Sequence, residues 1–208
     1  MINFSFPMKS TVSVYVNKLI SSLKADTMSK VQVLGEALYQ AWVENRSIYL
    51  CGNGGSAGNA IHLANDFLYG VGVKNGGGMR VEALSANPAI ITCLANDIGY
   101  ENIYAEQLRV KAEHGDVLIV LSGSGNSQNV VKALEIGNKI GMKTFAILGF
   151  NGGRCKELAG CPIHFEINDM QIAEDLQLIV GHMCMQWLCE QNITIHKNNV
   201  YMRTNNDR

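Results

Sequence analysis

The chain has 208 residues, a net charge of −1 at pH 7 and a pI near 6.5, with 47% hydrophobic and 17% charged residues. This composition excludes a disordered chain, and the balanced charge gives no indication of a nucleic-acid or membrane partner. Six cysteines without a CxxC pair, no recognisable signal peptide and no apolar run of roughly 18 residues favour a soluble, cytoplasmic protein.

The first part of the chain predicts a long helix followed by a strand. From about residue 11 to residue 44, apolar positions such as Val14, Leu38 and Trp42 recur at three- and four-residue steps. A helix of this kind must bury its apolar stripe, and a neighbouring subunit is a plausible place. The sequence SIYLCG, from Ser47, then predicts a buried strand that ends in a glycine-rich turn and a second helix.

The remaining elements alternate in type. MRVEAL predicts a strand, and residues 88–95 and 104–113 predict helices. DVLIVLSGSGNS, from Asp116, predicts a strand, a small-residue loop and a helix over about 128–140, whereas KTFAILGF and CPIHFEI predict two further strands before a final helix over 171–191. Strands that are almost continuously apolar and alternate with helices indicate an α/β fold with a parallel sheet covered on both faces.

The chain shows no internal linker and is expected to form a single domain over residues 1–208, with its core at about 45–192 and a frayed tail from about 197. The glycine-rich segment 70–79 is expected to be a flexible loop, acting as a lid or at an interface.

Two strand ends open into loops of the same chemical type, residues 51–56 (CGNGGS) and 122–127 (SGSGNS). Ligands of open parallel sheets bind at the carboxyl ends of strands, and amides at a helix N-terminus suit an anion. The second loop therefore predicts a phosphate cradle without a basic residue. Glycine and serine after a strand are also ordinary turn and cap residues. Neither loop matches a P-loop or a GxGxxG fingerprint, so no nucleotide cofactor is expected.

Three linked motifs carry a family resemblance: GNGGSxxxAxHxAxD, NDxGY and LSGSGNSxNVxxA, in this order. Over about residues 48–187 the chain resembles the sugar isomerase (SIS) domain family, and most closely its phosphoheptose isomerase branch. The resemblance implies a single SIS domain with a five-stranded parallel sheet in a flavodoxin-like three-layer sandwich. It also implies a homotetramer with active sites at subunit interfaces. The implied reaction interconverts sedoheptulose 7-phosphate, a phosphosugar, and a glycero-manno-heptose 7-phosphate for heptose and surface polysaccharide synthesis.

The resemblance also implies which residues bind the substrate. The phosphate loop falls on Ser122, Gly123, Ser124 and Ser127, and Gly123 stands where relatives usually carry a threonine. The first sugar-contacting loop falls on Asn53, Gly54, Gly55 and Ser56, and Asp97 matches an acidic residue near the sugar hydroxyls.

Aldose–ketose isomerisation needs a base near carbon and an acid near the carbonyl oxygen. His62 and Asp66 share a helix face because they are four residues apart. In the family, a histidine and a glutamate occupy these positions, and a glutamine and a histidine occupy those of Glu174 and His182. We assign the base to Asp66 and the acid to His182, with Glu174 a substrate contact. Under another alignment, Gln177 instead of Glu174 takes the position of the family's glutamine.

Some relatives hold zinc at these same positions, which implies that His62, Asp66, Glu174 and His182 are metal ligands here. Two histidines and two carboxylates form a reasonable zinc set, and the ion would polarise the sugar carbonyl. The alternative from spacing alone is a helix-surface pair, His62 with Asp66, and a core histidine, His182.

Three functions stay open. The leading one is the isomerase, supported by the retained acid–base groups. A non-catalytic tetramer of the same fold, acting as an adaptor for a replication initiator or as a phosphosugar sensor, is the rival that the changes at Asp66, Gly123 and Glu174 favour. The third is an isomerase of another phosphosugar.

Overall fold

The computed structural model describes residues 8–75 and 77–191. Its elements in chain order are α1 (Met8–Ser22), α2 (Ala25–Val43), β1 (Ser47–Gly52), α3 (Gly55–Asn65), the π-helical turn η1 (Asp66–Gly70), α4 (Gly72–Asn75), β2 (Arg80–Ala83), α5 (Pro88–Ile98), the 3-10 turn η2 (Tyr100–Asn102), α6 (Ile103–Lys111), β3 (Val117–Ser122), α7 (Gln128–Ile140), β4 (Lys143–Leu148), α8 (Gly153–Leu158), β5 (Cys161–His164) and α9 (Met170–Cys189).

The strands form one five-stranded sheet in the order β2-β1-β3-β4-β5, and every neighbouring pair is parallel. This arrangement confirms the predicted parallel α/β fold. All of the predicted strands are present, and α7 covers the predicted range. The short helices α4 and α8 were not predicted, because helices of four and six residues are too short to show a helical repeat of apolar positions.

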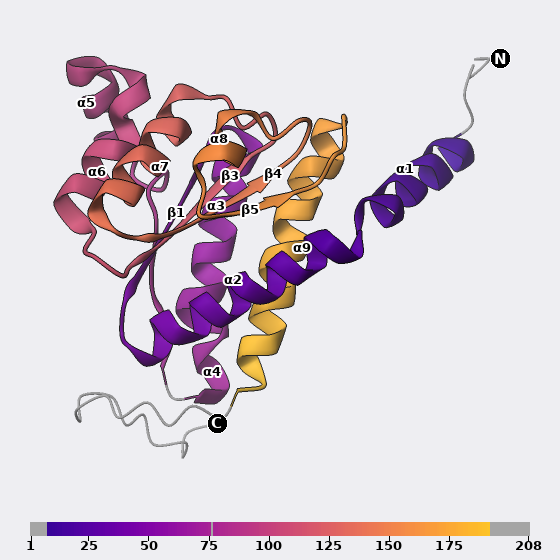
Figure 1. Cartoon of the computed structure of the whole chain (residues 1–208), viewed down its shortest axis with the longest axis horizontal. Helices are drawn as coiled ribbons and strands as arrows, with labels where there is room; N and C mark the ends of the chain where they lie inside the picture. The colour runs from indigo at the N-terminus through magenta and orange to yellow at the C-terminus, as the bar shows by residue number, and fades with distance from the viewer. Residues whose placement is uncertain (1–7, 76, 192–208) are drawn as a thin grey trace.

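The sheet lies between two helical layers (Figure 1). Alternate residues of each strand point to opposite faces, so Ile48 and Leu50 of β1 join the core beneath α2, α3 and α9. Tyr49 and Cys51 join the second core, beneath α6, α7 and α8. Because both faces are covered, β3 is buried along its whole length, and β1 and β4 are buried at every residue but the first.

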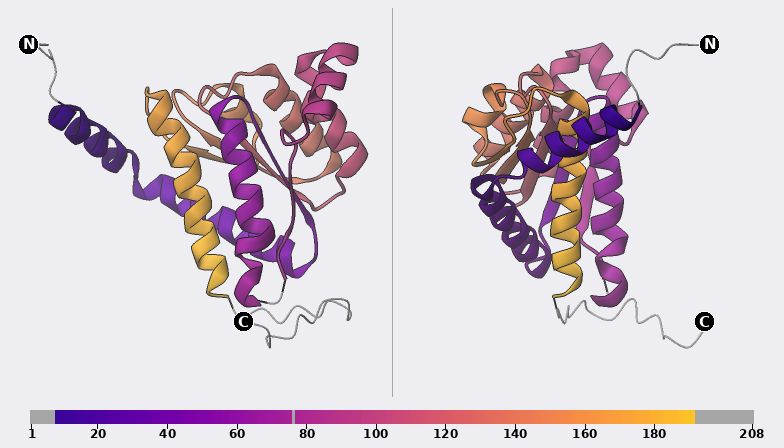
Figure 2. Two further views of the ribbon diagram at one scale, coloured as in Figure 1. Left: turned by 180° about the vertical axis from the view of Figure 1, so that it is seen from behind. Right: turned by 90° about the vertical axis from the view of Figure 1, so that its right-hand side faces the viewer.

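The prediction of one unbroken N-terminal helix is wrong: α1 ends at Ser22, and α2 starts at Ala25 after an extended Lys24. The hydroxyls of Ser21 and Ser22 both donate to the carbonyl of Lys18, at 2.9 and 2.8 Å, and such side-chain bonds compete with helix continuation. The break lets α2 lie on the sheet while α1 extends beyond it (Figures 1 and 2), in contact with α9 through Tyr15 and Asp175.

The glycine-rich segment 70–79 is not a simple loop. It contains α4, and it is attached to the body at two points, where Trp42 Nε1 donates to the Gly77 carbonyl at 3.2 Å and Met79 N donates to the Phe67 carbonyl at 3.1 Å. The predicted tail lies outside the described residues. Within the described part of the chain, no helix combines the length and apolar character needed to cross a bilayer.

Candidate functional site

The two small-residue loops leave neighbouring strands. The first follows β1 and the second follows β3, and these strands pair directly along residues 48–52 and 117–121. In a sheet of this order the strand sequence reverses between β1 and β3, and the loops on either side of such a switch point are where ligands bind. The topology therefore brings the predicted sugar and phosphate loops to the same place.

The serine loop is held in shape by hydrogen bonds from its backbone amides to its own serine hydroxyls. Ser122 is buried, and its Oγ accepts a hydrogen bond from Gly125 N at 3.0 Å. Gly125 has φ +67°, and a Cβ there would lie 2.0 Å from the Gly152 carbonyl oxygen, so only glycine fits. Ser124 Oγ accepts from Asn126 N at 3.3 Å.

Ser127 is the residue before α7, and its hydroxyl makes no capping bond to that helix. The first amides of α7 have no backbone carbonyl partner inside the helix, although Val130 N donates to the Asn129 side chain, and the loop therefore ends on a helix N-terminus that suits an anion. Ser127 therefore stands at a helix N-terminus with a hydroxyl that does not cap the helix.

Gly123 has a local structural partner. A Cβ at residue 123 would lie 2.5 Å from Met170 Sδ, at the start of α9. The Met170 thioether thus occupies the direction in which a threonine side chain would extend. A side chain at residue 123 would therefore require Met170 to move.

The first loop is tied to the second by a pair of amides. Asn53 Nδ2 donates to Asn129 Oδ1, and Asn129 Nδ2 donates back to Asn53 Oδ1, both at 2.8 Å. Tyr100 adds a third bond, since its hydroxyl donates to Asn53 Oδ1 at 2.9 Å. Asn129 belongs to the motif LSGSGNSxNVxxA and Tyr100 to NDxGY, yet the sequence alone suggested no role for either residue.

Ser56 and Gln177 form a buried link between α3 and α9. Gln177 Nε2 donates to Ser56 Oγ at 3.0 Å, and Gln177 Oε1 accepts from Asn59 Nδ2 at 3.0 Å. The two side chains are 4% and 1% exposed, respectively. Their predicted substrate contacts remain predictions, and the bonds described here position the two helices.

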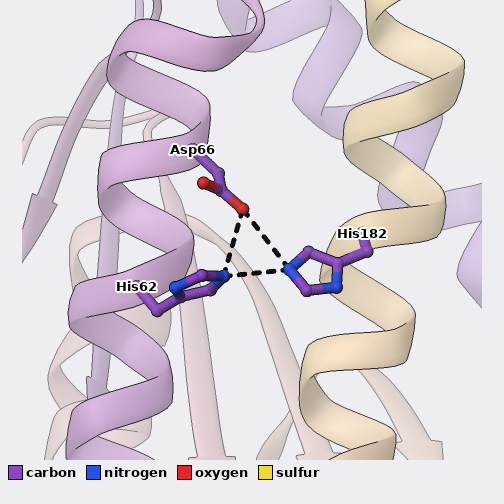
Figure 3. Close-up of side chains that lie close together, drawn as sticks. All are labelled: His62, Asp66 and His182. Carbon is purple, nitrogen blue, oxygen red and sulfur yellow. Dashed lines mark hydrogen bonds and ion pairs between the residues drawn. The ribbon is translucent and has the colours of Figure 1, made fainter.

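His62, Asp66 and His182 come together on the outer surface of α3 and α9 (Figure 3). The two Nε2 atoms are 3.0 Å apart, across 120 residues of sequence, and the rings meet edge to face. Asp66 Oδ2 lies 3.4 Å from each Nε2. The imidazoles are about half exposed and Asp66 is 16% exposed, so the cluster is open to solvent.

Two features of the backbone build this cluster. Helices α3 and α9 run side by side in the same direction (Figure 2), which places His182 opposite His62. Asp66 then opens the π-helical turn, in which Val71 N donates to the Asp66 carbonyl at 3.1 Å. Turns of this type are rare and occur often at functional sites.

Glu174 lies away from the cluster. Both of its carboxylate oxygens are 2.4 Å from where a Cβ on Gly55 would stand, so this side chain covers the first turn of α3. Gly55 precedes His62 by seven residues, which is about 10 Å along the helix. A carboxylate is favoured at this end because the helix dipole is positive there. The structure thus joins three of the four predicted metal ligands and separates the fourth.

The three clustered donors fit a metal ion. For zinc bonds of about 2.0–2.1 Å, neighbouring ligands of a tetrahedron are about 3.3 Å apart, close to the distances of 3.0 and 3.4 Å found here. Two imidazoles and one carboxylate are also the protein ligands of many catalytic zinc sites, which keep their fourth position open. His62, Asp66 and His182 are therefore a candidate metal centre.

Asp97 lies on α5, where its contacts are local. Its carboxylate accepts from Asn96 Nδ2 at 2.8 Å and from the Cys93 thiol at 3.5 Å. No described contact joins it to the serine loop or to the histidines. Tyr100, three residues later in the NDxGY motif, does contact the first loop through its hydrogen bond to Asn53.

These features define a three-layer parallel α/β protein with two small-residue loops at the topological switch point. The chain belongs to the SIS domain family, because the family's sequence model, described as SIS domain, matches residues 14–149.

Individual proteins of known sequence are also similar. The phosphoheptose isomerase of a Nitratiruptor species is 38% identical over 144 residues, or 69% of this chain and 76% of that one. That of Akkermansia muciniphila is 34% identical over 176 residues, or 85% and 90% of the two chains. The solved phosphoheptose isomerase of Francisella tularensis has a TM-score of 0.80 at 20% identity and covers 89% of this chain and 100% of that one, a likeness of fold.

Proposed function

We propose that this protein is an aldose–ketose isomerase that interconverts sedoheptulose 7-phosphate and a glycero-manno-heptose 7-phosphate, for heptose synthesis. The relatives named phosphoheptose isomerase support this substrate, at 34–38% identity. The observation that carries the chemistry is the meeting of His62, Asp66 and His182 on two adjacent helices. A protein that only recognised another protein would not need acid–base groups in mutual contact.

The proposed reaction moves a proton between C1 and C2 through an enediol. The Asp66 carboxylate takes the proton from the carbon beside the carbonyl group, and His182 gives a proton to the carbonyl oxygen. To complete the reaction, the same two groups return a proton to the neighbouring carbon and take one from the hydroxyl. His62 contacts both partners and holds their side chains in orientation, because its Nε2 lies 3.0 Å from His182 Nε2 and 3.4 Å from Asp66 Oδ2.

His62, Asp66 and His182 would also hold zinc. A bound zinc ion would polarise the substrate carbonyl as a Lewis acid. While all three side chains coordinated an ion, Asp66 and His182 would not be free to act as base and acid. For this reason, zinc content is to be measured together with turnover.

The proposed phosphate site is the serine loop, with Ser122, Ser124 and Ser127 as hydroxyl groups and α7 as the helix that receives the anion. Phosphate held there anchors one end of the sugar. Binding energy from this end, which does not react, can then align the reacting carbons.

We further propose a homotetramer with active sites at subunit interfaces. Within the described part of the chain, α5 has no buried residue although it carries Ile90, Ile91 and Leu94, and α1 exposes Val12, Val16 and Ile20. A groove of about 460 Å³ also lies between α2 and α9. It is lined mainly by apolar side chains, namely Met28, Val31, Gln32, Gly35, Glu36, Met183, Cys184 and Trp187. Light scattering on the purified chain tests this assembly.

The deciding experiment is incubation of the protein with sedoheptulose 7-phosphate, followed by NMR of the sugar. We expect an aldose signal that Asp66→Asn and His182→Ala each reduce by about a hundredfold or more. Turnover that survives both changes would refute the assigned roles. Binding without turnover would favour a phosphosugar sensor. Turnover of a different sugar phosphate alone would favour an isomerase with that other substrate.

A further inference from the structure

The reciprocal amide pair between Asn53 and Asn129 connects the exits of the two central strands. Asn53 is the first residue after β1, and Asn129 is the second residue of α7, directly after the serine loop. The pair therefore spans the switch point at which the proposed sugar and phosphate sites meet. Two hydrogen bonds of 2.8 Å between rigid, planar amides fix both the distance and the orientation of the loops.

Most of the hydrogen-bonding groups of this amide pair are already used by other groups of the protein. Asn53 Oδ1 accepts from Asn129 and from Tyr100, which uses both of its lone pairs. Asn129 Oδ1 accepts from Asn53 and from Val130 N, at 3.0 Å, and the Asn129 side chain is 1% exposed. Asn53 keeps one N–H for a substrate, and Asn129 is closed off from solvent.

We propose that Asn129 and Tyr100 are positioning residues that act through Asn53 and set the separation between the two ligand-binding loops. This inference rests on the proposed function. The span between a phosphate and the reacting carbons of a phosphosugar is fixed by covalent bonds, so both ends bind together only when the loops match that length. The pair would thus select the length of sugar phosphate that bridges the site.

The serine loop does not depend on this pair for its own shape. Gly149 N donates to the Gly123 carbonyl at 3.0 Å, and Cys155 N donates to the Gly125 carbonyl at 2.9 Å. These backbone bonds connect the loop to the neighbouring strand end and to α8. Removing the Asn129 amide should therefore leave the anion site formed but less exactly placed relative to the first loop.

The test compares two probes that differ in how many loops they reach. Inorganic phosphate occupies the serine loop alone, whereas sedoheptulose 7-phosphate reaches both. By calorimetry on the full chain, we expect Asn129→Ala to weaken sugar phosphate binding by about tenfold and phosphate binding by less than about twofold. Tyr100→Phe, which removes one hydroxyl, should change the sugar phosphate alone, by about threefold.

Two outcomes would overturn the inference. Equal weakening of both probes would mean that Asn129 only supports the loop, and no change in either would mean that the pair does nothing for binding. Ser127→Ala is the positive control, since it should weaken both probes alike.

The proposed function is judged separately. If the native chain binds sedoheptulose 7-phosphate without converting it, the enzyme proposal fails. The positioning proposal can still be tested, because it is measured by binding and needs no turnover. If pentose and hexose phosphates are added to the panel and no sugar phosphate binds better than phosphate, both proposals fail.

Discussion

Gly181 of α9 lies so close to Leu63 of α3 that a Cβ on Gly181 would stand 2.2 Å from Leu63 Cδ2. Each of these residues is the direct neighbour in sequence of one histidine of the site, His182 and His62. The contact therefore sets the spacing of the helices where the imidazoles meet. Leu63 is only 1% exposed, so it has little room to yield.

We expect Gly181→Ala to push the helices apart and to weaken zinc binding by about tenfold, at a cost of about 1–3 kcal/mol in the free energy of unfolding. Zinc affinity is measured by competition with a chelating dye, and stability by urea denaturation. Gly58→Ala is the matched control on α3, because a Cβ there meets nothing within 4 Å. Unchanged zinc affinity in Gly181→Ala would contradict the role given to this contact.

Glu174→Gln tests whether Glu174 belongs to the candidate metal centre. Because the Glu174 carboxylate covers Gly55 instead of joining the histidines, we expect zinc affinity to stay within about threefold of the native value. His182→Ala should lower the same affinity by at least about a hundredfold, since one of three clustered donors is lost. A large loss in Glu174→Gln would show that Glu174 turns toward the metal when it binds.

Ser127→Ala removes the loop hydroxyl that makes no capping bond to α7. We expect KM for the phosphosugar to rise by about tenfold, while the protein unfolds at nearly the native temperature. Steady-state kinetics and thermal melting measure the two effects. Ser29→Ala removes a hydroxyl that bonds only to the Asp26 carbonyl, and it should change neither quantity.

The thiol of Cys93 is exposed, but the hydrogen bond to Asp97 and the negative charge of that carboxylate raise its pKa. We expect Asp97→Asn to lower the pKa and to speed the reaction with a disulfide reagent near pH 8, because only the thiolate reacts. Stopped-flow absorbance follows the reaction, and Cys93→Ser identifies its signal. Cys51 and Cys155 are buried, burial raises the pKa of both, and they should react only after unfolding.

The contact between α1 and α9 is sensitive to high pH. The hydrogen bond from Tyr15 to Asp175, together with burial and the negative charge nearby, raises the pKa of the Tyr15 hydroxyl from 10.0 to about 12. A raised pKa means that the folded state holds the proton more tightly. The stability that the contact contributes is therefore complete below pH 10 and is lost as the pH rises through 10 toward 12.

Ultraviolet titration of the phenolate measures the Tyr15 pKa, with Tyr15→Phe identifying its contribution. Asp175→Asn should move that pKa back toward 10. A native Tyr15 that titrates near 10 would mean that α1 is not held on α9 in solution.

Much of the fold follows from local patterns in the sequence. Apolar runs such as 117–121 are short and end in turn residues, which favours strands buried on both faces, and strands that alternate with helices make a parallel sheet. The break at Leu23 and Lys24 is harder to predict, because serine hydroxyls that turn back on Lys18 leave no gap in the apolar repeat. Helix α8 has only six residues, too few for a period to be recognised.

The sequence by itself determined the parallel α/β class, the two glycine and serine loops, and the pairing of His62 with Asp66, since each of these depends on neighbours a few residues apart. Only the tertiary structure decided that His182 meets them and that Glu174 does not. It also decided that Asn53 is held by Asn129 and Tyr100. These contacts cross 47 to 120 residues of chain, and they depend on the angle and spacing at which helices pack, which no local pattern of residues fixes.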